Sequence, residues 1–151
     1  MTYTFSGCIN LTTAPKIPSG VANMHAAFQA CENLTTAPEL PSGVINMSHT
    51  FNNCDNLTTA PVIPNGVTSM AYAFMNCHAL IAAPAIPSGV TTMTYTYSHC
   101  TSLAGTITIN ANPSAYSDCF VGTTQPIVLT GSSTMLHELA ATANKDNVTV
   151  G

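Results

Sequence analysis

The residues that could do chemistry in this chain are its six cysteines, its five histidines and a few carboxylates. Such side chains supply nucleophiles, general bases and metal ligands. The cysteines, however, follow a fixed pattern, because an aromatic residue stands three positions before each of them. The six pairs are Phe5–Cys8, Phe28–Cys31, Phe51–Cys54, Phe74–Cys77, Tyr97–Cys100 and Tyr116–Cys119.

This pattern favours structural cysteines. The first five cysteines recur every 23 residues, so in a stack of repeats they occupy one buried column, where Cys behaves as a small apolar side chain. Stacked neighbours would point their Cβ atoms in parallel, which suits a disulfide poorly. We therefore expect reduced, buried cysteines, with a disulfide framework as the alternative that six cysteines allow.

The histidines do not form a catalytic arrangement. Those in the repeats lie at four different repeat phases: His25, His49, His78 and His99. No Ser or Cys nucleophile is tied to any of them, and the adjacent His137 and Glu138 diverge in direction on a helix. The GxSxG, HExxH and P-loop motifs are absent. We predict that the chain is not an enzyme and that it uses no cofactor.

One column of residues offers a metal site. The position after each cysteine holds Glu32, Asp55 and His78 in successive units. Stacked units lie about 4.8 Å apart, so two carboxylates and an imidazole would become neighbours and could hold a cation. The alternative is a solvated rim whose charges happen to align.

The element that positions all these residues is a 23-residue repeat, best represented by residues 54–76. Its Leu, Pro, Gly-Val, Met and aromatic positions recur in phase, and a fixed period of this length indicates a solenoid, in which each unit buries its apolar face by stacking. We assign residues 1–103 to an array of about four and a half units. We assign residues 104–151 to divergent last coils and a C-terminal cap with one helix.

Each unit is expected to contain an extended segment, a turn and a short helical turn. Over 57–63, alternation places Thr59, Pro61 and Ile63 on one side and Thr58 and Val62 on the other. Adjacent threonines on opposite faces argue against an ice-binding threonine grid. Residues 64–66 are typical of a turn, and 70–76 of one short α or 3₁₀ turn.

The C-terminal residues are predicted to form strands and one helix. Residues 106–111, 126–131 and 147–150 have the composition of strands. Ser133 is a candidate cap of a helix that continues to about residue 143. The apolar face of this helix would hold Leu136, Leu139, Ala140 and Ala143.

Composition excludes several partners. Only 5% of residues are charged, with two Lys, no Arg and a net charge of −4, so binding to nucleic-acid phosphates is not expected. No apolar run is long enough for membrane insertion. Only seven residues precede Cys8, so a signal peptide is not expected in this chain, which leaves open that it is a fragment of a longer protein. The first coil has no polar cap, which favours a longer array or self-association through this coil.

Two sets of columns point outward and are candidate contact surfaces. The first holds Tyr3, His49, Tyr72 and Tyr95, because this position would face away from the Met and Phe core; exposed tyrosines are favoured at protein interfaces. Its alternative role is packing against a neighbouring loop. The second set is a flat, small-residue face on the extended segments: Thr12, Thr35, Thr58, Lys16 and Glu39.

The repeating pattern C-x-x-L-T-x-x-P-x-[IL]-P-x-G-V-x-x-M-x-x-x-F resembles the BspA-type, or Treponema pallidum-type, leucine-rich repeat. This resemblance covers residues 1–103 and implies a right-handed, β-rich leucine-rich-repeat solenoid. It also implies a bacterial surface or extracellular protein used for adhesion and for binding a protein or glycan on a cell surface. Related arrays in phage-encoded proteins suggest a virion-associated variant. The alternative function is a structural spacer or assembly subunit that stacks through the open N-terminal coil.

Overall fold

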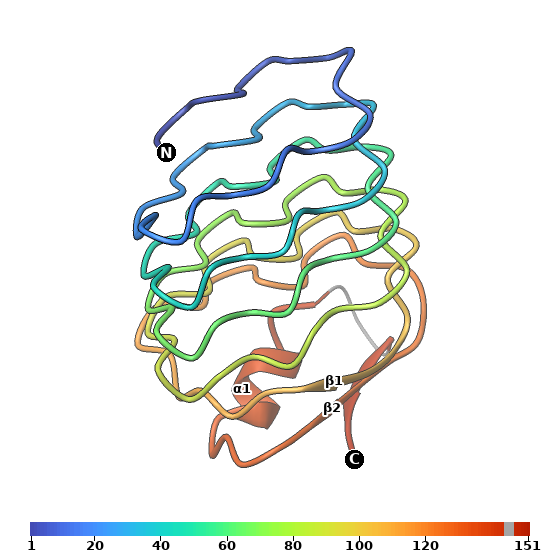
Figure 1. The fold of residues 1–151 in the computed structure, drawn as a ribbon. Coiled ribbons are helices and arrows are strands. Elements are labelled where there is room, and N and C mark those ends of the chain that lie inside the picture. The colour runs from blue at the N-terminus through green and yellow to red at the C-terminus, as the bar shows by residue number, and fades with distance from the viewer. Residues whose placement is uncertain (144–146) are drawn as a thin grey trace.

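The computed structural model describes residues 1–143 and 147–151. It is a stack of coils with the N-terminus at one end and helix α1 (Leu136–Ala140) at the other (Figure 1). Three strands follow the repeats, β1 (Gly105–Thr108), β2 (Ile127–Thr130) and β3 (Val148–Val150), and they form one parallel sheet in the order β1-β2-β3. In the described residues, no helix has the length and apolar character that crossing a membrane requires.

The repeats contain isolated bridges in place of continuous strands, so the expectation of β-rich coils is not met. The parallel bridges connect residues of equivalent phase, and the two longest series are Thr13–Thr36–Thr59–Ala82 and Asn23–Asn46–Ser69–Thr92–Ala115. The physical reason is proline. Each of the first four units carries two prolines in its extended segment, and a proline has no N–H to donate to a ladder.

The expected α or 3₁₀ turn over 70–76 is a series of tight turns. Tyr72 and Asn76 have φ values of 58° and 60°, which no right-handed helix contains. Alternate residues instead donate to the next coil, with Met70 N–H to Thr92 O at 2.9 Å and Tyr72 N–H to Thr94 O at 2.8 Å. A left-handed conformation costs a non-glycine residue about 1–2 kcal/mol, and the hydrogen bonds between coils offset that cost.

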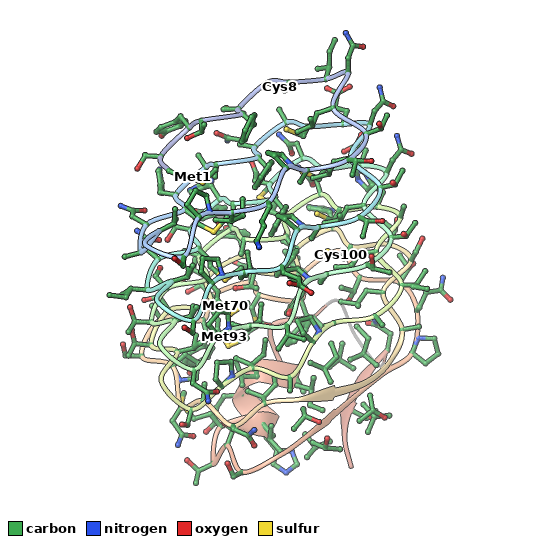
Figure 2. All side chains as sticks on the ribbon, viewed as in Figure 1. Met1, Cys8, Met70, Met93 and Cys100 are labelled. Atoms are coloured by element: carbon green, nitrogen blue, oxygen red, sulfur yellow. The ribbon has the colours of Figure 1, made fainter. Side chains whose placement is uncertain are left out.

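The core is a set of stacked columns. The innermost column is aromatic, and its rings are nearly parallel: Phe28 to Phe51 at 5.7 Å, Phe51 to Phe74 at 5.5 Å, Phe74 to Tyr97 at 5.5 Å and Tyr97 to Phe120 at 5.8 Å. The methionine column, which includes Met70 and Met93 (Figure 2), is fully buried from Met24 onward, whereas Met1 on the first coil is partly buried. The apolar columns predicted from the sequence are therefore confirmed.

The expectation of reduced cysteines is confirmed, since all six are free. Five are buried, and Cys8 is exposed on the first coil (Figure 2). The Sγ of Cys54 donates to the carbonyl of Phe28 at 3.1 Å, and Cys77 and Cys100 on the next two coils make the equivalent bond. Burial raises the pKa of the Cys100 and Cys119 thiols to about 12. These thiols are packing groups that carry no charge near neutral pH.

Alternation within the extended segment fails at the threonine pairs. Thr58 and Thr59 are both exposed, whereas Pro61 and Ile63 are buried and Val62 is exposed, as alternation requires. A period of two needs a continuous pleat, and the prolines limit the pleat to short pieces. The inference that adjacent threonines face opposite sides is therefore wrong.

The C-terminal helix is shorter than predicted. α1 covers five residues, and Met135 occupies its N-cap position. Ser133 lies before the helix, where its Oγ accepts a hydrogen bond from Met135 N–H at 3.1 Å. Leu139 is the buried residue of α1, and the helix contacts β2 and β3. β1 and β2 lie within the segments predicted to be strands, apart from the first residue of β1, and β3 begins one residue later than predicted.

Candidate functional site

The outward tyrosine column is positioned by its backbone. Tyr3, His49, Tyr72 and Tyr95 have φ values of 56°, 58°, 58° and 54°, so each lies at the left-handed position of its turn. The buried aromatic of the same turn comes two residues later, as Phe74 does after Tyr72. The turn thus sends one aromatic side chain into the core and leaves the other at the surface, where Tyr3 is 55% exposed.

These outward rings form a stacked series, which we call the aromatic ladder: Tyr3, His25, His49, Tyr72 and Tyr95. Its best-stacked part is His49 on Tyr72, with ring centroids 4.5 Å apart and planes 7° apart, followed by Tyr72 on Tyr95 at 5.0 Å and 19°. His25 continues the ladder edge-on, 5.4 Å from His49 and 5.2 Å from Tyr3.

Sequence reasoning missed His25. The in-phase residue of its unit is Ala26, which is buried, and the column therefore seemed to be interrupted. The preceding residue, His25, fills the gap, and its Nε2 lies 3.1 Å from the hydroxyl of Tyr3. The sequence did contain a signal for this role, because the aromatic His25 stands next to Ala26, the one small residue in a column that is otherwise aromatic.

The ladder ends at a carboxylate. Asp118 occupies the next in-phase position, with a φ of 53°, and its hydrogen bond with the Tyr95 hydroxyl raises the pKa of that phenol. Burial and the neighbouring His25 lower the pKa of His49. Both shifts favour the uncharged forms of His49 and Tyr95 at pH 7.

The geometry suits recognition. Because the rings of His49, Tyr72 and Tyr95 stack on one another, their edges and polar tips are left to meet a partner. Stacking also restricts the motion of these side chains in the free protein, so less conformational entropy is lost when a partner binds. Half-buried tyrosines are frequent among the residues that dominate interface energies.

The second set of predicted contact residues lies on the extended segments. Thr12, Thr35 and Thr58 are exposed as expected. The hydroxyls of Thr35 and Thr58 donate to the carbonyls of Thr12 and Thr35, at 3.3 and 3.1 Å. Lys16 and Glu39 are also exposed and line shallow grooves that are described below.

The structure brings together two of the three predicted metal ligands. His78 Nδ1 lies 3.5 Å from Asp55 Oδ1, and both side chains are about half exposed. Glu32 does not complete the set, since within the described residues no three ligand side chains come close enough to hold an ion. Asp55 and His78 lie side by side at the surface as a half-exposed pair of polar side chains.

Comparisons with known proteins agree with this architecture. The model of the BspA type leucine rich repeat region matches residues 1–104 and 25–135, with six copies. The fold is similar to the crystal structure of a T. pallidum leucine rich repeat protein, with a TM-score of 0.64 and 20% sequence identity. That similarity covers 99% of this chain and 64% of the other. A comparison with curated proteins gave no match. Because the family model matches most of its residues, the chain belongs to the BspA-type leucine-rich repeat family.

Proposed function

We propose that this chain is a non-catalytic binding and adhesion module, and that the aromatic ladder contacts a protein or a glycan on a cell surface. Leucine-rich repeat proteins typically mediate protein binding, and the family is generally non-enzymatic. The observation that carries the proposal is the continuous stack from Tyr3 to Tyr95 at the surface. An ordered aromatic surface of this kind has few uses in a monomeric protein except recognition.

The proposed setting is a bacterial cell surface or a phage particle. The low charge supports it, because this surface relies on Thr, Ser and Asn for its polarity and gains little solubility from charge repulsion. A protein held in an external assembly has less need of such repulsion than one in a crowded compartment. The C-terminal segment with α1 is proposed to cap the last coils.

The test is a binding screen that compares the chain with a ladder variant. A glycan array and a panel of extracellular-matrix proteins would be probed with the wild type and with the double variant Tyr72→Ala, Tyr95→Ala. Truncation of aromatic residues that dominate an interface costs about 2 kcal/mol or more each. We therefore expect partners of the wild type to bind the variant about 30-fold more weakly if one tyrosine dominates the contact, and several hundred-fold more weakly if both contribute.

A matched control separates recognition from folding. Thr68→Ala with Thr91→Ala changes two exposed residues on the same coils and should leave binding unchanged. If every partner binds the ladder variant as tightly as it binds the wild type, the aromatic ladder does not contribute to binding and the proposal is wrong. The same is true if the wild type binds nothing on either panel.

A structural spacer that stacks through its first coil is a second candidate function. The observation that favours it is the ring of Phe5, which is only half-buried and stacks on Phe28 at 5.3 Å, whereas Phe28 is fully buried. Sedimentation equilibrium would test it. Concentration-dependent association that Phe5→Ser abolishes is the expected result, and a monomer at high concentration would contradict it.

A further inference from the structure

A groove opens between the proline-containing segments of the second and third units. Each of these segments holds two prolines, Pro38 with Pro41 and Pro61 with Pro64, which cannot donate backbone hydrogen bonds. The hydrogen bonds that join successive coils elsewhere therefore stop here. The backbone N–H and C=O groups of four residues between the prolines have no hydrogen-bond partner among the described residues: Glu39, Leu40, Val62 and Ile63.

The groove has a volume of about 600 Å³ and runs between residues 37–42 and 61–66. Its lining is mainly apolar, with Pro38, Leu40 and Ile63 among the walls, and Val62 stands at the surface with 84% exposure. Glu39 is the one charged residue among those that line it. A volume of this size is typical of ligand sites.

A second groove adjoins the first. A smaller groove of about 470 Å³ lies between the first and second units and shares Glu39 and Leu40. Further along the stack, Ile86 N–H donates to Thr108 O at 2.8 Å and Asn110 N–H donates to Ile86 O at 3.0 Å. These bonds join the fourth unit to the coil that contains β1. The opening therefore depends on prolines facing prolines.

The position that carries Glu39 varies while its neighbours repeat. In successive units this position holds Lys16, Glu39, Val62 and Ala85, whereas the prolines on either side recur in all four. Glu39 is exposed and forms no ion pair with another described residue. The one acid–base contact among the described residues joins Asp55 and His78. The scaffold is thus constant, and the second unit is the one of these four that places a carboxylate at this position.

We propose that this groove binds an extended peptide segment that carries a lysine or arginine between proline or other apolar residues. The cationic side chain pairs with the Glu39 carboxylate, and the apolar residues lie against Pro38, Leu40 and Ile63. The peptide backbone supplies donors and acceptors to the unpaired groups of the groove walls, as it does when an extended peptide binds a strand edge. A charge-assisted hydrogen bond at Glu39 gives the site its selectivity. This site is separate from the aromatic ladder.

The test uses nuclear magnetic resonance on the isotope-labelled full chain. The probe is a blocked octapeptide with one central lysine flanked by prolines and leucines, and the comparison peptide has glutamate in place of the lysine. The lysine peptide should shift the amide resonances of Glu39, Leu40, Val62 and Ile63 in a saturable manner. Glu39→Gln should weaken binding about three- to tenfold, as expected for a partly exposed charge-assisted pair.

Two controls keep the result specific. Glu32→Gln removes another exposed carboxylate and should not change the affinity, and the double variant Tyr72→Ala, Tyr95→Ala should bind the peptide as the wild type does. The proposal is overturned if the lysine and glutamate peptides bind alike or if the groove amides do not move. It is also overturned if hexylamine or a neutral oligosaccharide mixture shifts these amides as strongly as the lysine peptide does.

Discussion

Replacing Tyr97 by phenylalanine should stabilise the protein. Tyr97 is the one tyrosine in the buried column between Phe28 and Phe120, and its side chain is fully buried. Its ring stacks between Phe74 and Phe120, at planes 4° and 12° apart. Its hydroxyl, however, has no hydrogen-bond partner among the described residues. Burial accordingly raises the pKa of this phenol far above its usual value.

The magnitude follows from two opposing terms. An unsatisfied buried hydroxyl costs about 1–3 kcal/mol, which Tyr97→Phe recovers. The space that one oxygen atom leaves costs a few tenths of a kcal/mol, at about 24 cal/mol per Å³ of cavity. The ring stacking is unchanged. We therefore expect the free energy of unfolding to rise by about 1–2 kcal/mol, which for a chain of this size is a rise in Tm of about 2–8 °C.

Urea and thermal unfolding would measure the change, with an unchanged urea m-value as evidence that the two proteins unfold alike. The reciprocal variant Phe74→Tyr introduces a hydroxyl one coil away and should destabilise the protein by about 1–3 kcal/mol. A Tyr97→Phe protein that is less stable than the wild type would show that the hydroxyl has a partner, and it would refute the reasoning.

Three further predictions concern the thiols and the glycines. Maleimide should modify Cys8 alone in the folded chain and all six cysteines in urea, as counted by mass spectrometry, and rapid modification of a second thiol would contradict the buried column. In the folded chain the pKa of Cys100 and Cys119 is about 12, so between about pH 9 and pH 11 these thiols lose their protons only in the unfolded chain. The free energy of unfolding should therefore fall as the pH rises through this range, by up to about 1.4 kcal/mol per thiol per pH unit. Urea midpoints measured at pH 8, 9 and 10 would check this, and a midpoint independent of pH would contradict it. Gly131→Ala would place a Cβ against the carbonyl group of Ile109 on the neighbouring coil, at a φ of 120°, and should destabilise the protein by about 3 kcal/mol or more. Gly20→Ala meets no atom within 4 Å and should change stability by less than about 1 kcal/mol. Thermal unfolding would show both effects. If the Gly131→Ala and Gly20→Ala variants were equally stable, Gly131 would not lie as close to the neighbouring coil as the structure places it.

The repeat pattern was sufficient to predict the core, because one buried position per column repeats a similar side chain in every unit. Cys31, Leu34 and Phe28 needed only their phase to be placed. The strands of the C-terminal segment were also recognisable, since residues such as Ile127 and Leu129 alternate without an intervening proline. Local pattern and tertiary structure agree in these places.

The surface could not be predicted in the same way. The left-handed residues of each turn, such as Tyr72, are stabilised by hydrogen bonds to the next coil, and no local sequence signal encodes them. His25 joins the aromatic ladder although it is out of phase, because the neighbouring coils decide where its ring can stack. The groove beside Glu39 exists because prolines of two units face each other, which becomes visible only when the units are stacked.

Hydrogen exchange on the complex with a partner found in the binding screen tests the central claim most directly. The account predicts that the partner slows exchange in the turns that carry the aromatic ladder, at residues 47–53, 70–76 and 93–99, and that Tyr72→Ala with Tyr95→Ala abolishes this protection. Protection confined to the extended segments, with the ladder turns exchanging as in the free chain, would contradict it.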